Sequence, residues 1–594
     1  MKRSNFEEYR TRLRTSRSAN SRGRRWPVIA AGFLLLVLLA TVSNGLAQQL
    51  IFDNQEANSS TSIELLATTS YVPIISKKPI TIPPHNSTGP IFGVNFISSA
   101  EDQVDEQQYQ NGLSTGATWN RWPLYWFNIE TNPNTYNWSR QDTTVQQDLA
   151  HGFEIDAILL GTPLFYTTST IEEVDPGRPE KRGPFVMRAP QAAAPVGLYD
   201  PIFTDGTDTP GPGKVINQSN VWARFAYTAV NRYKPGGAMA QAYSWPPGVG
   251  ITHWEIWNEP DLSWFWDSST ADYARLLKVG YLSVKQADPS ASVLVGGLAN
   301  FQKPTFYVDI MNIFDSDPMA VTHKYFHDIL ATHSYFNSWE SWWHVYRATL
   351  TMGEHGVDKD VWLNESGVPA WDDYPGPNWD PTSSWRATMS EQADYLIQNA
   401  FFATFAGADA IFHFQLYDGC GNQPAGTDFP PHGGELCGNP SYPICAGDAF
   451  GLFRNPTDAV CFTQHPQPET ARPYLTAFQL LTANFQGVEP LWRQRPGGTT
   501  PYNGPQEWIA FHRPETNERL VAMWSRVEAS QTAIIEAYGT SGLILRPDGS
   551  SEVVYPSNGE YSLHLPGATN HNDPNPELLA IGGRPLILIE SGSN

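Results

Sequence analysis

Eight short apolar runs, separated by longer amphipathic stretches, constrain the fold of this chain more than any other feature. Their alternation is typical of a parallel sheet whose strands are joined by crossover helices. The predicted strands are Ile91–Phe96, Ala117–Trp122, Glu154–Leu160, Thr252–Trp257, Ser292–Gly296, Asp328–Ser334, Val361–Asn364 and Ala408–Gln415. We therefore predict an α/β fold, a (β/α)8 barrel, whose active site would lie at the carboxyl ends of the strands.

The chain of 594 residues is too long for one compact domain. We expect the catalytic barrel to span residues 91–487. Residues 488–594 contain short alternating runs divided by Gly, Pro and Asn, which predict a C-terminal antiparallel β-sandwich that buttresses the barrel. Residues 48–90 are rich in Ser, Thr, Asn and Pro, a composition typical of a linker. The predicted sandwich strands are Trp508–His512, Leu520–Trp524, Thr532–Tyr538, Ser551–Tyr555, Tyr561–Leu565 and Pro585–Ile589.

Residues 1–47 predict a targeting segment. Basic residues precede an uncharged apolar run from Val28 to Leu39, and Gly45 and Ala47 suit a signal-peptidase site. The uncharged stretch 27–47 is also long enough to cross a bilayer, so membrane anchorage by an uncleaved helix is the alternative. In both cases the domains that follow lie outside the cytoplasm, either secreted or at the cell surface.

Charge and cysteine content narrow the partners. The formal net charge is −22 and only 16% of residues are charged, so we expect no nucleic-acid partner, which would need a basic face. Cys420, Cys437, Cys445 and Cys461 predict two disulfides that staple one loop of an exported protein. A zinc site is the less favoured alternative, because no C-x-x-C pair is present. We expect no metal and no cofactor.

A polar pair ends the fourth predicted strand. The apolar run stops at Asn258-Glu259-Pro260, which would place both polar side chains at the mouth of the barrel. In glycosidic cleavage one carboxylic acid protonates the leaving oxygen, and a neighbouring amide can hold the sugar 2-hydroxyl. Asn258 and Glu259 fit these two roles, although Asn and Pro also favour an ordinary turn.

A second glutamate ends the seventh predicted strand. The apolar segment Val361–Asn364 leads directly into Glu365. Carboxylates at the ends of strands four and seven would face each other across the mouth. In a retaining glycosidase the two groups lie roughly 5 Å apart, so that the second can attack the anomeric carbon. The pair therefore indicates the cleavage of a glycosidic bond.

Further motifs around the fourth strand carry a family resemblance. They are Trp-Asn-Glu-Pro at 257–260, Asp261, Phe265-Trp266, Tyr273, Leu276-Leu277, Val284-Lys285, Asp288-Pro289 and Val295-Gly296-Gly297. The chain, from about residue 91 to 485, resembles clan A glycoside hydrolases, and most of all family 39. That family includes β-xylosidases, α-L-iduronidases and bacterial exopolysaccharide-cleaving enzymes. The resemblance implies a retaining double displacement, with Glu259 as general acid/base and Glu365 as nucleophile.

The resemblance also assigns roles on other strands. Arg121 matches an arginine that orients the nucleophile and keeps it ionised. His333 and Tyr335 match a His-x-Tyr pattern on strand six, where the Tyr hydroxyl can hydrogen-bond the nucleophile, although a lone His is more often a core residue. Candidate sugar platforms, for which core packing is the alternative, are Trp122, Trp126, Trp257, Trp264 and Trp266.

Three departures from a plain barrel bear on the substrate. Residues 165 to about 218 are inserted after strand three, and the cysteine-bearing segment follows strand eight, so both would wall the mouth. Clan members often place a Trp near the end of strand eight, where this chain offers Phe414, Gln415 or Tyr417. The sugar and the choice between exo and endo attack stay open, with a slight preference for an open, endo-acting groove.

Alternatives to hydrolysis also stay open. A transglycosylase would use the same carboxylates while excluding water from the second step. A catalytically silent carbohydrate-binding envelope protein could share the fold, although the retention of both glutamates together with Asn258 and Arg121 argues against it. The expected partner is a polysaccharide or oligosaccharide substrate, and the sequence predicts no oligomeric state.

Overall fold

The computed structural model describes residues 89–101, 104–167, 189–370, 372–373, 387–418, 449–454, 467–499, 503–570 and 579–592. The predicted targeting segment, nearly all of the linker and the four cysteines with their predicted disulfides lie outside these ranges. The chain divides into two compact units, 1–69 and 70–594, and every described residue belongs to the second. Across the described ranges, no helix has both the length and the hydropathy needed to span a bilayer.

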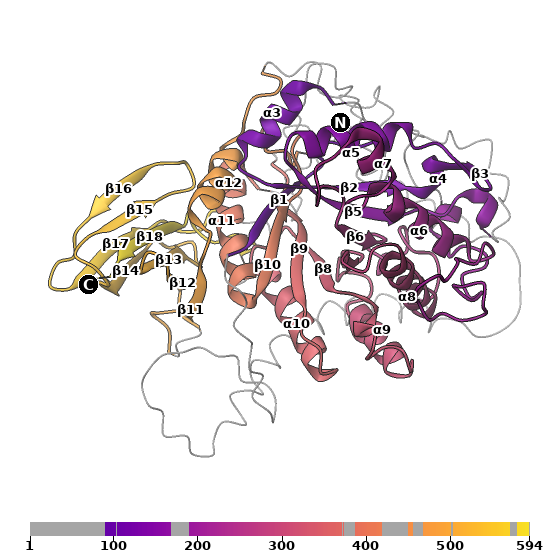
Figure 1. Ribbon diagram of the computed structural model, residues 1–594. Coiled ribbons are helices and arrows are strands. Elements are labelled where there is room, and N and C mark those ends of the chain that lie inside the picture. The colour runs from indigo at the N-terminus through magenta and orange to yellow at the C-terminus, as the bar shows by residue number, and fades with distance from the viewer. Residues whose placement is uncertain are drawn as a thin grey trace, which may run out of the picture. The chain divides into compact units, whose positions relative to one another are not determined.

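Eight parallel strands close into a barrel, as predicted (Figure 1). Their order is β1-β10-β9-β8-β7-β6-β5-β2, so each strand pairs with its neighbours in the βα series. The strands are β1 Ile91–Asn95, β2 Trp119–Tyr125, β5 Glu154–Leu160, β6 His253–Ile256, β7 Ser292–Val295, β8 Ile329–Tyr335, β9 Asp360–Gly367 and β10 Ala408–His413. Each overlaps one of the eight predicted strands, which confirms the barrel.

Helices follow the strands and cover the outside of the barrel (Figure 1). They include α3 Glu106–Ser114, α5 Ser139–Ala150, α6 Val221–Tyr233, α8 Thr270–Ala287, α9 Phe306–Asp315, α10 Glu340–Glu354, α11 Met389–Ala406 and α12 Pro473–Asn484. Reciprocal capping boxes start the two longest of them, Ser269 with Asp272 at α8 and Thr388 with Glu391 at α11. Both boxes are visible in the sequence as Ser or Thr followed three residues later by an acid.

The described part of the insertion after β5, residues 189–218, runs along α8. Arg275 of α8 donates to the carbonyl oxygen of Leu198 and pairs with Asp208 at 2.5 Å. Tyr199 Oη donates to Asp272 at 2.8 Å. These contacts attach the segment to the outer helix layer. The placement of this insertion beside the mouth of the barrel stays a prediction.

The C-terminal region is a sandwich of two antiparallel sheets, as predicted. A six-stranded sheet, ordered β11-β12-β13-β18-β15-β16, packs on a two-stranded sheet of β14 and β17. Buried Trp508, Met523, Ile535, Leu563 and Leu588 are part of the core between the sheets. The strands are β11 Glu489–Gln494, β12 Gln506–Arg513, β13 Glu518–Ser525, β14 Gln531–Glu536, β15 Gly542–Leu545, β16 Ser551–Val554, β17 Glu560–Leu565 and β18 Leu586–Ser591.

The other face of the six-stranded sheet shares a core with the barrel. Phe511 of β12 and Trp524 of β13 lie edge-on to Phe401 and Phe402 of α11, with ring centroids 5.5 and 5.2 Å apart. All four side chains belong to the large hydrophobic cluster that also contains the barrel strands. Burying this much aromatic surface stabilises the packing of the sandwich on α11. The sandwich therefore buttresses the barrel.

Candidate active site

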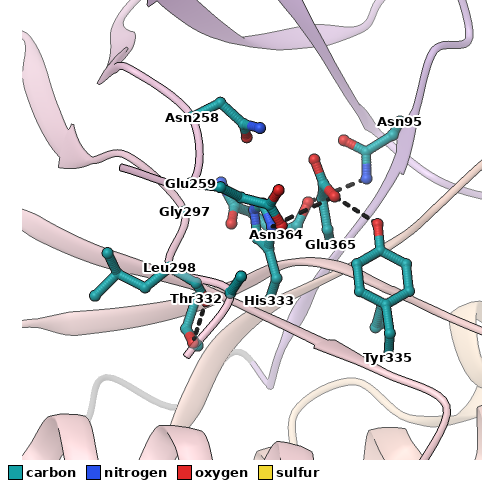
Figure 2. Close-up of polar contacts among 12 residues, drawn as sticks. Asn95, Asn258, Glu259, Gly297, Leu298, Thr332, His333, Tyr335, Asn364 and Glu365 are labelled. Atoms are coloured by element: carbon teal, nitrogen blue, oxygen red, sulfur yellow. Dashed lines mark hydrogen bonds and ion pairs between the residues drawn. The ribbon is translucent and has the colours of Figure 1, made fainter. Parts of the chain in front are cut away.

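Two glutamates meet at the carboxyl ends of β6 and β9 (Figure 2). One oxygen of Glu259, one oxygen of Glu365 and a ring nitrogen of His333 all lie within 4.8 Å of one another. Direct nucleophilic attack on a sugar requires carboxyl groups about 5–5.5 Å apart, whereas a water placed between them requires about 6.5–9.5 Å. One oxygen of each group within 4.8 Å of the other fits the closer spacing.

A sharp turn after β6 directs Glu259 into the mouth. Trp257 and Glu259 have φ values of 74° and 43°, in the left-handed region that non-glycine residues rarely occupy. The backbone N–H of Glu259 donates to the carbonyl oxygen of Gly297 at 2.9 Å, and the indole N–H of Trp257 donates to that of Phe265 at 2.7 Å. These bonds hold a strained turn in place, as is common where a catalytic side chain must be aimed.

His333 touches both carboxylates. Its Nδ1 atom lies 2.8 Å from Oε1 of Glu259 and 3.4 Å from Oε2 of Glu365. The opposite ring nitrogen, Nε2, is buried and makes no hydrogen bond within the described part of the chain. A Cβ atom on Gly297 would lie 1.9 Å from Nε2, so only glycine leaves room for the imidazole in this orientation.

Arg121 connects the nucleophile candidate to the floor of the site. Its Nη1 atom lies 2.5 Å from Oε1 of Glu365 and 3.2 Å from Oδ1 of Asn95. Nε and Nη2 donate to the two oxygens of Glu255 at 2.7 and 3.0 Å, and Nη2 also donates to Oδ1 of Asn258 at 2.8 Å. Such a forked, buried contact fixes geometry as well as charge. Arg121 therefore orients both Glu365 and the amide beside the acid.

The surroundings of Glu365 favour its ionised form. Burial alone would raise the pKa of Glu365, but the positive charges of His333 and Arg121 and the hydrogen bond from Tyr335 outweigh it and lower the pKa. Tyr335 Oη donates to Oε2 of Glu365 at 2.5 Å. A carboxylate that stays ionised at pH values below the ordinary pKa of a glutamate can act as a nucleophile.

The surroundings of Glu259 favour its protonated form. Burial raises the pKa of Glu259 to about 7, and the charge of Glu365 adds to this effect, while the hydrogen bond and charge of His333 oppose it. Two neighbouring carboxyl groups whose environments push their pKa values apart are typical of an acid paired with a nucleophile. Glu259 therefore holds a proton that it can donate near neutral pH.

A buried polar layer beneath the carboxylates includes residues that the sequence did not single out. Asn364 Nδ2 donates to Glu255 at 3.0 Å and to Asp156 at 3.3 Å, and all three side chains are fully buried. Burial and the charge of Glu255 raise the pKa of Asp156 well above its usual range. With Asp156 neutral, Arg121 has fewer negative charges to balance. The sequence signal that could have identified Asp156 and Glu255 was an acidic residue inside each of two otherwise apolar strands.

The structure corrects the prediction of sugar platforms for Trp257 and Trp266. Their exposed fractions are 0% and 1%, and their rings pack on each other with centroids 5.1 Å apart. Trp122 and Trp126 are also fully buried. These four rings are core residues and present no face to a ligand. Trp264, by contrast, is 50% exposed.

The family resemblance predicts a Trp at the end of β10. This chain has an aromatic cluster there instead. Phe414 is joined to Gln415 by a cis peptide bond, and its ring lies edge-on to Tyr335 with centroids 5.9 Å apart. Gln415 is buried beside it. Tyr417 instead accepts a hydrogen bond from Asn111 of α3 at 2.7 Å. Phe414 thus contacts Tyr335 of the site.

The donor atoms of Glu259, His333 and Glu365 are close enough together to hold a metal ion. Both oxygens of Glu365, however, already accept hydrogen bonds, from Arg121 and from Tyr335. A guanidinium 2.5 Å from a ligand oxygen opposes the approach of a second cation. The arrangement suits proton transfer and nucleophilic attack better than metal binding.

Solved structures share this fold. A family 39 glycoside hydrolase from the gut symbiont Bacteroides cellulosilyticus WH2 aligns over 85% of this chain and 81% of its own, with a TM-score of 0.52 and 14% identity. A monomeric β-xylosidase from Caulobacter crescentus CB15 aligns over 85% and 98%, with a TM-score of 0.49 and 14% identity. No protein-family model and no curated protein matches the sequence. At these identities the first likeness establishes the fold alone.

Proposed function

We propose that this chain is a retaining glycoside hydrolase that cleaves O-glycosidic bonds by double displacement, with Glu259 as general acid/base and Glu365 as nucleophile. The observation that carries the proposal is the close pair of carboxyl groups with opposite protonation preferences. A barrel can host many unrelated activities, so the fold alone would not suffice. The proposal rests on the side chains at the mouth.

In the first step, the Glu365 carboxylate attacks the anomeric carbon while the bond from that carbon to the leaving oxygen breaks. Glu259 gives its proton to the leaving oxygen, which departs as an alcohol, and a glycosyl ester forms on Glu365. In the second step, ionised Glu259 takes a proton from a water that attacks the anomeric carbon. The ester breaks, Glu365 leaves as a carboxylate, and the product keeps the configuration of the substrate.

Asn258 has a supporting role in this proposal. Arg121 donates to its Oδ1 atom, while its Nδ2 atom has no hydrogen bond among the described residues. The amide N–H groups are therefore available to a substrate hydroxyl next to the anomeric carbon. Such a hydrogen bond strengthens as the sugar flattens toward the oxocarbenium-like transition state.

The substrate we propose is a polysaccharide or oligosaccharide encountered outside the cytoplasm. The basic and apolar N-terminal sequence supports export, either by secretion or with residues 27–47 as an anchor. The solved structure of similar fold from Bacteroides cellulosilyticus WH2 is a family 39 glycoside hydrolase, which agrees with a carbohydrate substrate. A transglycosylase would use the same first step, and products analysed with and without added acceptor sugars separate the two activities.

Azide rescue of two matched variants tests the proposal. Substrates are 2,4-dinitrophenyl glycosides of xylose, glucose and arabinofuranose, whose leaving group needs no protonation. In Glu365→Ala, azide can enter the space of the lost carboxylate and attack the anomeric carbon once, which inverts the configuration. In Glu259→Ala, the ester on Glu365 still forms and azide attacks it, so two inversions give net retention.

The two variants are expected to give glycosyl azides of opposite configuration. Asp358→Ala, a substitution in the loop before β9 and not in the site, serves as the control and should keep wild-type rates without azide. Identical azide products from both variants, or undiminished activity of Glu365→Ala, would contradict the assignment. The anomeric proton couplings in NMR spectra distinguish the products.

A further inference from the structure

Two exposed aromatic side chains lie on consecutive loops at the mouth of the barrel. Trp264, in the loop after β6, is 50% exposed, and Phe301, in the loop after β7, is 69% exposed. Exposed apolar side chains that gather at one place on a surface often mark a binding site, and a sugar's C–H face packs well on an aromatic ring. Both loops belong to the same end of the barrel as Glu259.

The two loops are fastened to each other. The backbone N–H of Ser263 donates to Oε1 of Gln302 at 2.9 Å, which joins the residue before Trp264 to the residue after Phe301. Asp261 is fully buried and accepts from the backbone N–H groups of Ala299 and Asn300 at 3.1 and 2.7 Å. Three bonds thus set the two loops side by side, so the aromatic residues occupy neighbouring positions on the rim.

The position of this pair relative to the carboxylates defines which part of a substrate it would meet. Glu259 lies five residues before Trp264, and its backbone N–H is bonded to Gly297 in the loop that carries Phe301. Glu365, on β9, is separated from β7 by β8 in the barrel order. The acid must face the leaving oxygen, while the nucleophile faces the anomeric carbon. The aromatic pair is therefore on the leaving-group side.

We infer that Trp264 and Phe301 form a platform for the sugar units of the leaving group. This inference rests on the proposed function and adds the substrate class to it. An enzyme that removes one terminal sugar from a small aglycone has no use for such a platform. A platform beyond the acid favours a leaving group that is itself a chain of sugars, so the substrate is an oligosaccharide or polysaccharide and not a glycoside with a small aglycone.

Two substrates of different length test the platform. An aryl glycoside has no sugar in the leaving group, whereas a hexasaccharide of the same sugar does. In Trp264→Ala and Phe301→Ala, kcat/KM for the hexasaccharide should fall roughly tenfold, the effect of losing one aromatic face contact. The value for the aryl glycoside should change less than twofold. Tyr243→Ala is the control, because Tyr243 is 51% exposed but ends the helix Ala238–Tyr243, in the connection that leads to the amino end of β6.

Binding gives a readout that does not require turnover. Affinity electrophoresis in gels with soluble xylan, β-glucan, arabinan or uronate-rich polysaccharide should retard the wild type in at least one gel, and both variants less. No retardation of the wild type, equal retardation of the variants, or equal loss of kcat/KM on long and short substrates would overturn the platform. Retardation without any glycosidase activity would instead overturn the proposed function and leave the platform standing.

Discussion

The Nδ1 atom of His333 lies 2.8 Å from the Oε1 atom of Glu259, within hydrogen-bonding distance of the proposed acid. Burial would lower the pKa of His333, but the charges of Glu365 and Glu259 and the hydrogen bond to Glu259 raise it. The imidazole can therefore stabilise negative charge on Glu259 after that residue has given its proton away. It also adds positive charge beside Glu365. His333 therefore stabilises the ionised forms of both glutamates.

The pH dependence of kcat/KM should be bell-shaped. Glu365 must be ionised, which holds above its lowered pKa, and Glu259 must be protonated, which holds below about 7. Activity on a 4-nitrophenyl glycoside should therefore rise at a pH below the ordinary glutamate pKa and fall near neutrality. In Glu259→Ala, assayed with the same 4-nitrophenyl glycoside, the alkaline fall should vanish while the acid limb remains. An unchanged alkaline limb would exclude Glu259 as the acid.

Glu259→Gln should stabilise the protein at alkaline pH. The folded-state pKa of about 7 lies above the ordinary value of 4.5. The folded state thus holds the proton more tightly than the unfolded state, and this stabilisation is lost as pH rises from 4.5 through 7. Relative to wild type, the variant should gain about 3 kcal/mol in the free energy of unfolding between about pH 4 and about pH 8. Urea denaturation at both pH values measures this, and an equal effect at both would count against a raised pKa.

Tyr335→Phe should weaken the nucleophile without removing it. The substitution deletes the hydroxyl that donates to Glu365 at 2.5 Å, one of the contacts that lower the pKa of Glu365. The acid limb of the pH profile should move to higher pH, and kcat/KM should fall roughly 10- to 100-fold, as expected for a hydrogen bond to a charged group. Tyr417→Phe, whose hydroxyl contacts Asn111 instead, is the matched control. A variant with wild-type pH limits would show that Tyr335 does not act on Glu365.

Gly297→Ala should displace His333. The added Cβ would lie 1.9 Å from Nε2 of the imidazole, so the ring cannot keep its present position against Glu259. We expect a loss of stability of about 1–3 kcal/mol from overpacking and a large fall in kcat/KM. Gly211→Ala is a suitable control, because the nearest atom to its Cβ is 3.9 Å away, in the Lys214 side chain. Thermal unfolding and kinetics on an aryl glycoside measure the two effects, and wild-type activity would contradict the proposed role of His333.

The sequence was sufficient to predict the barrel and the two glutamates for one physical reason. Parallel strands all end at the same edge of a closed sheet, so a polar residue that stops an apolar run is placed at the mouth without any three-dimensional information. Glu259 and Glu365 each follow such a run. The C-terminal strands were recognisable by alternation, except for β11 and β15. The first is largely exposed with little alternation, and the second, Gly-Leu-Ile-Leu, has no polar side chain that could alternate with its apolar ones.

Other parts of the site depend on tertiary contacts that residue type does not reveal. Glu255 lies inside β6, and its place in the site follows from its contact with Arg121, 134 positions away in the sequence. The role of Gly297 as the space for an imidazole depends on the packing of β7 against β8. Tryptophan residues at the mouth looked alike in the sequence, but burial separates Trp257 and Trp266 from Trp264. Exposure is set by packing, not by residue type.

Trapping of the covalent intermediate tests the central claim most directly. A 2-deoxy-2-fluoro glycoside with a 2,4-dinitrophenyl leaving group slows both steps, but the good leaving group lets the first proceed, so the glycosyl ester accumulates. Peptide mass spectrometry of the inactivated protein should find the fluorosugar on Glu365, and Glu365→Gln should remain unlabelled. A label on any other residue, or products of inverted configuration without any label, would contradict the account.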